Sequence, residues 1–176
     1  MNVIQKAHNC TICAPFLKDG VRPVFTVHPA ARINIIGQAP GRKVHESGIP
    51  WDDASGKRLR EWLGVDSETF YQPELFAIMP MGFCFPGTGK SGDLPPRPEC
   101  APQWHQPLLR MMPNIQLILL FGQYAQKQYL GKITIPQALK KANPSYMTAH
   151  FGKWHNESIK PTEAGYDVTD GPNGNG

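Results

Sequence analysis

The stretch "RINIIGQAPGRKVHESGIPW", residues 32–51, decides the fold. Its apolar run 33–36 has the length of a strand and stops at a glycine, and two further runs, 75–79 and 117–121, also end near Gly or Pro. Short apolar runs of this kind are typical of strands that are buried on both faces of a parallel sheet. The loop 37–51 then leaves the carboxyl edge of that sheet, where open α/β folds bind their ligands.

The segments between these runs favour helices. The segment "SGKRLREWLGV", residues 55–65, predicts a helix with Ser55 as its N-cap and Gly64 as its C-terminal stop. Its apolar face would consist of Leu59, Trp62 and Leu63. Two more helices are expected at 104–112 and 124–130. Strands that alternate with helices predict an α/β fold.

Length and composition set the class of protein. The chain has 176 residues, of which 40% are hydrophobic, which suits one globular core. No apolar run has the length that a bilayer span requires, and the start "MNVIQKAHNCTICAPF" lacks the apolar core of a secretion signal. We therefore expect a cytoplasmic monomer that does not enter a membrane.

The positive charge is distributed unevenly. Residues 1–132 contain 14 Lys and Arg against 10 Asp and Glu, whereas residues 133–176 contain 4 of each kind. Five of the basic side chains lie in or just after the 37–51 loop: Arg42, Lys43, Lys57, Arg58 and Arg60. This asymmetry suits a polyanionic partner such as DNA, although a solvated basic surface would look the same.

Four cysteines are the next signal. Cys10 and Cys13 form a C-x-x-C pair, and Cys84 and Cys100 form a wider pair of sixteen-residue spacing. In a reducing compartment such a set indicates metal binding more than disulfides, and thiolates suit an iron–sulfur cluster or zinc. A zinc ribbon would normally supply its second pair as another close C-x-x-C. Buried cysteines without a ligand are the remaining alternative.

With these motifs in order, residues 8 to about 131 resemble the iron–sulfur uracil-DNA glycosylases. "GQAPG" at 37–41 matches the G-E-A-P-G loop of that family with one change, and "SGIPW" at 47–51 matches its Gly-x-Pro-Phe element. The resemblance implies a three-layer α/β/α fold with a short central parallel sheet. It also implies a 4Fe-4S cluster as the cofactor, held by Cys10, Cys13, Cys84 and Cys100.

The resemblance further implies a substrate, which is uracil in single- or double-stranded DNA. The base must be rotated out of the helix before its bond to deoxyribose is hydrolysed. Trp51 stands where the family stacks an aromatic ring on uracil, although it could equally anchor the loop to the core. Ser55 and Lys57, at the start of the next helix, would contact a phosphate or simply form a surface helix. The main chain of five loop residues would bind the base: Gly37, Gln38, Ala39, Pro40 and Gly41. All of them except Pro40 have an N–H group to donate.

The catalytic positions depart from the family pattern. Gln38 replaces its acidic residue and could only orient water, because an amide is not a general base. His45 falls at a position that is usually acidic, and could accept a proton or be an exposed loop histidine. Asp52 and Asp53 are alternative water-positioning residues or helix caps, and Met79 replaces the Asn that reads the pyrimidine edge.

The C-terminal part departs further, because the His-Pro-Ser motif of the family is missing after residue 131. Residues 133–176 instead resemble an internal segment of the type I sulfatases, in which Lys153 and His155 would bind sulfate. The sulfatase nucleophile motif is absent, so sulfatase activity is not expected. We therefore predict a glycosylase-like domain, 1–131, joined to a fragment, 132–176, whose run 146–151 replaces the lost strand and whose end is disordered.

Three hypotheses for function follow. The first is a uracil-DNA glycosylase impaired by the loss of His-Pro-Ser. The second is an inactive iron–sulfur DNA-binding remnant or chimeric gene product. The third, a small electron-transfer protein, leaves "GQAPG" unexplained.

Overall fold

The computed structural model describes residues 1–130, 149–150 and 168–169, and its chain divides into two compact units, 1–125 and 126–176. The elements of the first unit are α1 (Val3–His8), η1 (Ala14–Phe16), β1 (Ile33–Ile36), α2 (Arg42–Ser47), α3 (Ala54–Leu63), α4 (Ser67–Phe70), β2 (Phe76–Ile78), β3 (Thr88–Gly89), β4 (Gly92–Asp93), α5 (Cys100–Arg110) and β5 (Leu117–Leu120). Helix α6 (Gln123–Leu130) crosses the boundary, and β6 (Ala149–His150) and β7 (Val168–Thr169) belong to the second unit.

The centre of the first unit is a parallel sheet in the order β2-β1-β5. Ile35 of β1 stands opposite Ile78 of β2 on one side and Leu119 of β5 on the other. All three strands fall within the apolar runs of the sequence, so the predicted α/β class with a short parallel sheet is confirmed. Parallel pairing also brings the segments after all three strands to one edge of the sheet.

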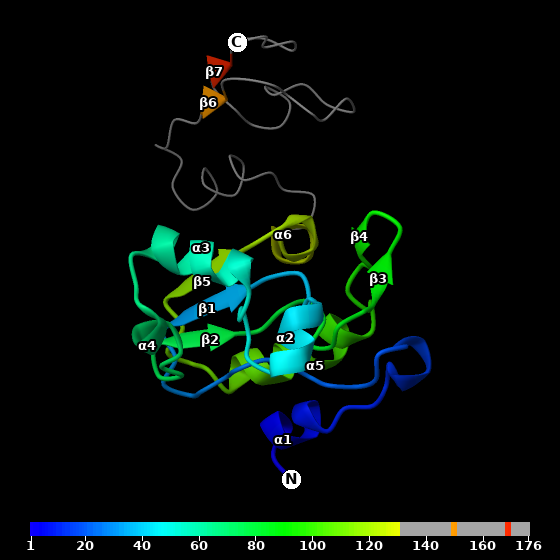
Figure 1. The fold of residues 1–176 in the computed structure, drawn as a ribbon. Helices are drawn as coiled ribbons and strands as arrows, with labels where there is room; N and C mark the ends of the chain where they lie inside the picture. Colours follow the sequence, from blue (N-terminus) through cyan, green and yellow to red (C-terminus); the bar gives the residue numbers. More distant parts are fainter. Residues whose placement is uncertain (131–148, 151–167, 170–176) are drawn as a thin grey trace. The chain divides into compact units, whose positions relative to one another are not determined.

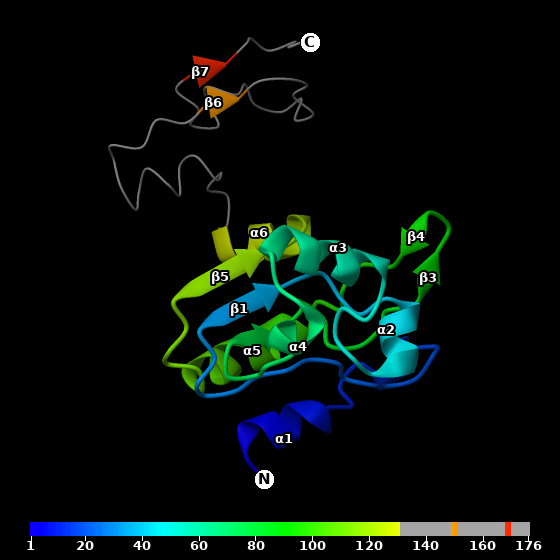
Figure 2. The same cartoon turned by 60° about the vertical axis from the view of Figure 1, so that its left-hand side comes forward.

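Helices cover both faces of this sheet, as the two views of the fold show (Figures 1 and 2). Helix α3 lies over one face and α5 over the other, with α1 packed against α5. On the α3 side, Leu59 joins Ile35 and Phe70 in a buried apolar cluster. These layers agree with the predicted α/β/α arrangement.

Several boundaries differ from those expected. Helix α3 begins at Ala54 with Asp53 as its N-cap, so the prediction of Ser55 as the cap was wrong. The Asp53 carboxylate accepts the Gly56 amide at 2.8 Å and the Ser55 hydroxyl at 2.6 Å, and a carboxylate is the better acceptor for both. Trp62 was also misplaced, since it is 71% exposed and lies off the apolar face of the helix.

The edge strand β5 is less buried than its sequence suggests. Leu117 is 48% exposed and Ile118 is 39% exposed, whereas all of β2 is buried. Among the described residues the parallel sheet ends at β5, so this strand has a neighbour on one side only. β2 is the other edge strand and is nevertheless buried throughout, so the edge position alone does not account for the exposure of β5. The expectation of burial on both faces therefore holds for β1 and β2 and not for β5.

The predicted replacement strand, 146–151, lies largely outside the described residues, as do Lys153 and His155. Its described part is β6, which pairs in parallel with β7 in a separate two-stranded sheet. Across the described part of the chain, no helix has both the length and the hydropathy that spanning a bilayer requires.

Candidate functional site

The GQAPG loop, 37–41, connects β1 to α2 at the carboxyl edge of the sheet. Two hydrogen bonds fix it to the segment after β2: the Met81 amide donates to the Gly37 carbonyl at 2.9 Å, and the Gly82 amide donates to the Gln38 carbonyl at 3.0 Å. Within the described residues, the amides of Gln38 and Ala39 donate to no protein acceptor. They remain suitable donors to a ligand.

This loop borders a cavity of about 360 Å³, a size in the range of small-molecule sites. The predicted residues that line it are Gly37, Gln38, Ala39, Pro40, Gly41, Trp51 and Ser55. The walls that the sequence did not predict include Asp93, Leu94 and Phe121. The structure therefore brings seven of the nine predicted catalytic and substrate-binding residues to one cavity.

His45 and Lys57 are the two predicted residues that do not line the cavity. His45 lies on α2, where its Nε2 is 3.1 Å from the Asp19 carbonyl and its ring faces Phe85 at a centroid distance of 5.8 Å. Lys57 is exposed on α3, beyond the cavity rim. The segment 37–51, predicted as a loop because of its Gly and Pro residues, also contains the short helix α2. Gly41 is the N-cap of this helix and Gly48 is its C-cap.

Trp51 lines the cavity, and its backbone has a conformation that is rare for a residue other than glycine. Its φ of 57° lies in the left-handed region, where it is the one non-glycine residue among those described. The ring meets Phe121 edge-on at 5.8 Å, and a Cβ built on Gly37 would lie 3.0 Å from Trp51 Cζ2. Trp51 also packs on the core cluster, so it anchors the loop in addition to lining the cavity.

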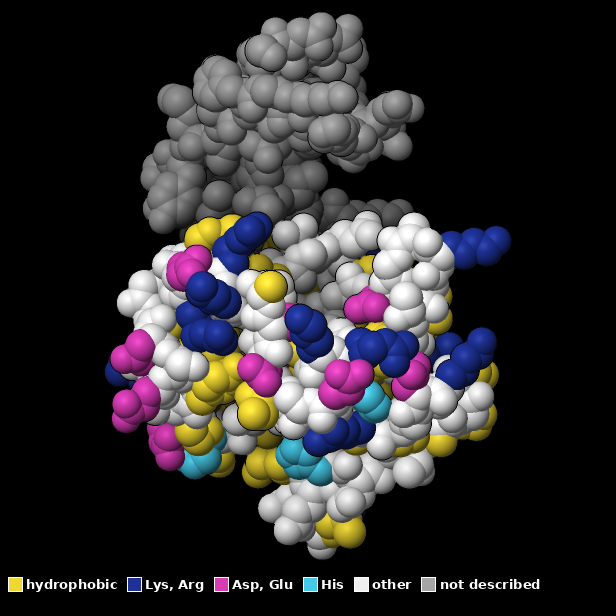
Figure 3. Space-filling model, viewed as in Figure 1, with side chains coloured by type: hydrophobic (Ala, Val, Ile, Leu, Met, Phe, Trp, Pro, Cys, Tyr) yellow, Lys and Arg dark blue, Asp and Glu magenta, His cyan; other side chains and the backbone are white. Residues whose placement is uncertain are grey.

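The basic side chains near the cavity divide into two groups. Arg42 pairs with Asp19 at 2.9 Å, and Arg60 donates to Trp51 O and Tyr71 Oη, both at 3.4 Å. Lys43, Lys57 and Arg58 are exposed and form no ion pair in the described part of the chain. Figure 3 shows Lys and Arg interspersed with Asp and Glu on its face, so the positive charge there is local and not continuous.

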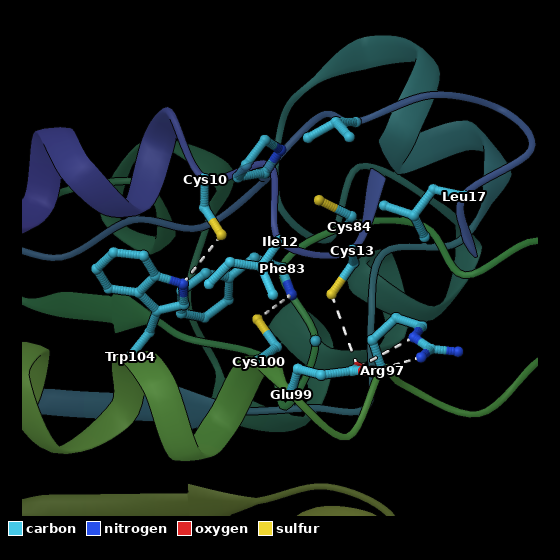
Figure 4. A pocket seen from close by; sticks show the side chains of 13 residues that line it. Cys10, Ile12, Cys13, Leu17, Phe83, Cys84, Arg97, Glu99, Cys100 and Trp104 are labelled. Carbon is cyan, nitrogen blue, oxygen red and sulfur yellow. Dashed lines mark hydrogen bonds and ion pairs between the residues drawn. The ribbon is translucent and has the colours of Figure 1, made fainter. Parts of the chain in front are cut away.

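A second cavity is lined by all four cysteines (Figure 4). Cys10 and Cys13 come from the N-terminal segment, Cys84 from the segment after β2, and Cys100 from the first residue of α5. All four are free thiols. No group of three or more His, Cys, Asp or Glu side chains in the described ranges is placed to hold a metal ion.

The surroundings of these sulfurs are largely apolar, except for the Arg97–Glu99 ion pair, whose carboxylate accepts from Cys13 Sγ at 3.8 Å. Trp104 Nε1 donates to Cys10 Sγ and the Phe83 amide donates to Cys100 Sγ, each at 3.3 Å. Burial raises the pKa of Cys84 to about 11 and that of Cys100 to about 12, with partial compensation by backbone amides. Both thiols are therefore protonated at neutral pH unless a cation compensates their charge.

An α/β domain with a glycine-rich loop and a lined cavity at the carboxyl edge of its sheet defines a ligand-binding or catalytic protein of open-sheet type. The family model of the uracil DNA glycosylase superfamily matches residues 24–164. The chain belongs to this superfamily, whose members act on DNA. The match includes the whole GQAPG loop and continues past the predicted junction at 131, while the sulfatase-like segment stays a prediction.

Proposed function

We propose that this protein is a DNA glycosylase that hydrolyses the bond between uracil and deoxyribose. The observation that carries the proposal is the cavity, in which the GQAPG loop and Trp51 face one space at the carboxyl edge of the sheet. A flipped base needs such a pocket, with a ring to stack on and donors for its polar edge. The protein would act as a cytoplasmic monomer on single- or double-stranded DNA.

Each wall of the cavity has a part in this proposal. The Trp51 ring would stack on uracil, and the amides of Gln38 and Ala39 would donate to its oxygens as negative charge develops on the departing base. The Gln38 side chain, half-buried at the cavity, would orient water. Of the exposed cations, Lys57 and Arg58 on α3 are free to contact phosphates.

We propose that Cys10, Cys13, Cys84 and Cys100 hold a 4Fe-4S cluster. The four thiols face one cavity, which fits a cofactor with four thiolate ligands. Zinc is the alternative occupant that four thiolates would also suit. When bound, the cluster would link the N-terminal segment to the sheet.

The activity test uses purified full-length protein and oligonucleotides that carry one uracil, in single- and double-stranded form. Protein in excess over DNA allows slow excision to be detected, and alkali-labile abasic sites are the readout. Thymine-containing DNA of the same sequence is the control. Excision at uracil alone supports the proposal. Tight DNA binding without excision would instead support the inactive remnant.

The cofactor test is separate from the activity test. Protein purified without oxygen should be brown and absorb broadly near 400 nm (roughly, from thiolate-to-iron charge transfer). Cys84→Ala should lose this absorbance and its iron. Stoichiometric zinc without iron would overturn the cluster.

A further inference from the structure

The hairpin of β3 and β4 places a carboxylate in the cavity that the sequence motifs did not indicate. Thr88 pairs with Asp93 across the hairpin, and the Leu94 amide closes it by donating to the Gly87 carbonyl at 2.9 Å. Gly92 has a φ of 126°, a conformation that a side chain would disfavour, so the tight hairpin depends on glycine here. Asp93 and Leu94 emerge from it as part of the cavity wall.

The exposed Asp93 carboxylate lies between Thr88 of the hairpin and the end of the GQAPG loop. Thr88 Oγ1 donates to Asp93 Oδ1 at 3.5 Å, while a Cβ built on Gly41 would lie 3.3 Å from Asp93 Oδ2. Oδ2 therefore lies against the end of the GQAPG loop. Within the described residues it accepts no hydrogen bond and forms no ion pair.

The other carboxylate in the cavity wall is already engaged. Asp53 Oδ1 accepts both the Gly56 amide and the Ser55 hydroxyl as the cap of α3. Gln38 has no charge and cannot accept a proton from water.

We infer that Asp93 is the carboxylate that activates water in this cavity, supplying from the hairpin the acidic group that position 38 lacks. This inference rests on the proposed function and names a catalytic residue for it. The C1′–N1 bond breaks with its electron pair on uracil, and the water oxygen bonds to C1′. Asp93 accepts the water proton and passes it to solvent or to the departed base. Its negative charge also stabilises the positive charge on the sugar.

The first test compares excision by the wild type, Asp93→Asn and Glu46→Gln under single-turnover conditions. Glu46 is an exposed carboxylate of α2 that does not line the cavity, so its variant removes one negative charge without changing the cavity wall. Asp93→Asn should reduce excision by about 100-fold or more, as expected for a lost general base. Glu46→Gln should retain wild-type excision. Equal rates in the Asp93 variant and the wild type would overturn the inference.

The second test does not depend on turnover. Binding is measured to DNA in which the target sugar is a cationic pyrrolidine, and to DNA with a neutral tetrahydrofuran at the same place. The wild type should prefer the cationic site, and Asp93→Asn should lose at least about fivefold of that preference while binding neutral DNA no more weakly. Glu46→Gln should keep the preference.

The two tests separate the inference from the function on which it rests. A wild type that never excises uracil refutes the proposed function, whereas an Asp93→Asn variant that keeps the preference for the cation refutes the role of Asp93. Loss of affinity for both probes to the same extent also refutes that role, because it would show a general change of the surface.

Discussion

Gly56 is the position at which one methyl group should disturb both the fold and the site. This glycine is buried in the first turn of α3, directly beneath the Trp51 main chain. A Cβ at Gly56 would overlap the Trp51 carbonyl oxygen and lie 2.9 Å from Trp51 Cβ. Backbone cannot give way by changing a rotamer, so Gly56→Ala must displace either α3 or Trp51.

The size of the effect follows from two opposed terms. Overpacking of a buried contact costs about 1–3 kcal/mol, whereas alanine gains at most about 1 kcal/mol over glycine in a helix. We expect a net loss of about 1–2 kcal/mol in the free energy of unfolding, measured by urea denaturation. Each kcal/mol lowers the Tm of a domain of this size by roughly 2–8 °C. Affinity for uracil-containing DNA should fall as well, because Trp51 moves.

Glu61→Ala is the matched control, since it also introduces alanine into α3 at an exposed position. It should leave the free energy of unfolding within about 0.5 kcal/mol of the wild type. A Gly56→Ala protein as stable as the wild type, with unchanged DNA binding, would show that the close approach of α3 to Trp51 is not required.

Three further predictions concern the loop, the N-terminal segment and the core. Trp51→Ala should weaken binding to uracil-containing DNA by about 1–3 kcal/mol more than binding to matched thymine DNA; equal weakening in a titration would assign Trp51 to the fold alone. Arg22 donates to the carbonyls of His45 and Glu46, each at 2.7 Å. Arg22→Ala should therefore loosen α2 and lower the free energy of unfolding by about 1 kcal/mol. Unchanged hydrogen exchange in α2 would contradict this role of Arg22. Burial lowers the pKa of His105 to about 4 from its ordinary 6.5. The free energy of unfolding should therefore be full above pH 6.5 and fall by up to about 3 kcal/mol as the pH drops towards 4. Urea denaturation of His105→Gln should show a smaller loss of stability over that pH range, and a loss equal to that of the wild type would exclude His105 as its source.

The sequence contained enough information for the sheet and for most of the cavity wall. Apolar runs of strand length marked β1, β2 and β5 because buried parallel strands need uninterrupted apolar side chains. The GQAPG loop and Trp51 could be placed at the carboxyl edge of the sheet because both follow β1. Their assignment to one pocket came from the resemblance to the glycosylases.

Other parts of the site depend on contacts that no local pattern encodes. Helix α2 spans only Arg42–Ser47, and Arg22, twenty residues away in the sequence, supports its last turn. Asp93 lies on a two-residue strand within the Gly-rich segment "GTGKSGD", which reads as an ordinary loop. Its role depends on its distance from Gly41, which only the folded chain fixes.

The segment 81–84 explains why a cofactor far from the reacting bond would matter for this protein. On one side its amides hold the GQAPG loop, through Met81 to Gly37 and Gly82 to Gln38. On the other side the Phe83 amide donates to Cys100 Sγ, and the next residue is Cys84 itself. The segment 81–84 therefore connects the cysteine cavity, which Gly82, Phe83 and Cys84 line, to the GQAPG loop, which Met81 and Gly82 hold by hydrogen bonds. If the four thiols bind a cluster, its free energy of binding would also hold the carbonyls of the GQAPG loop in place, and with them the amides that face the base.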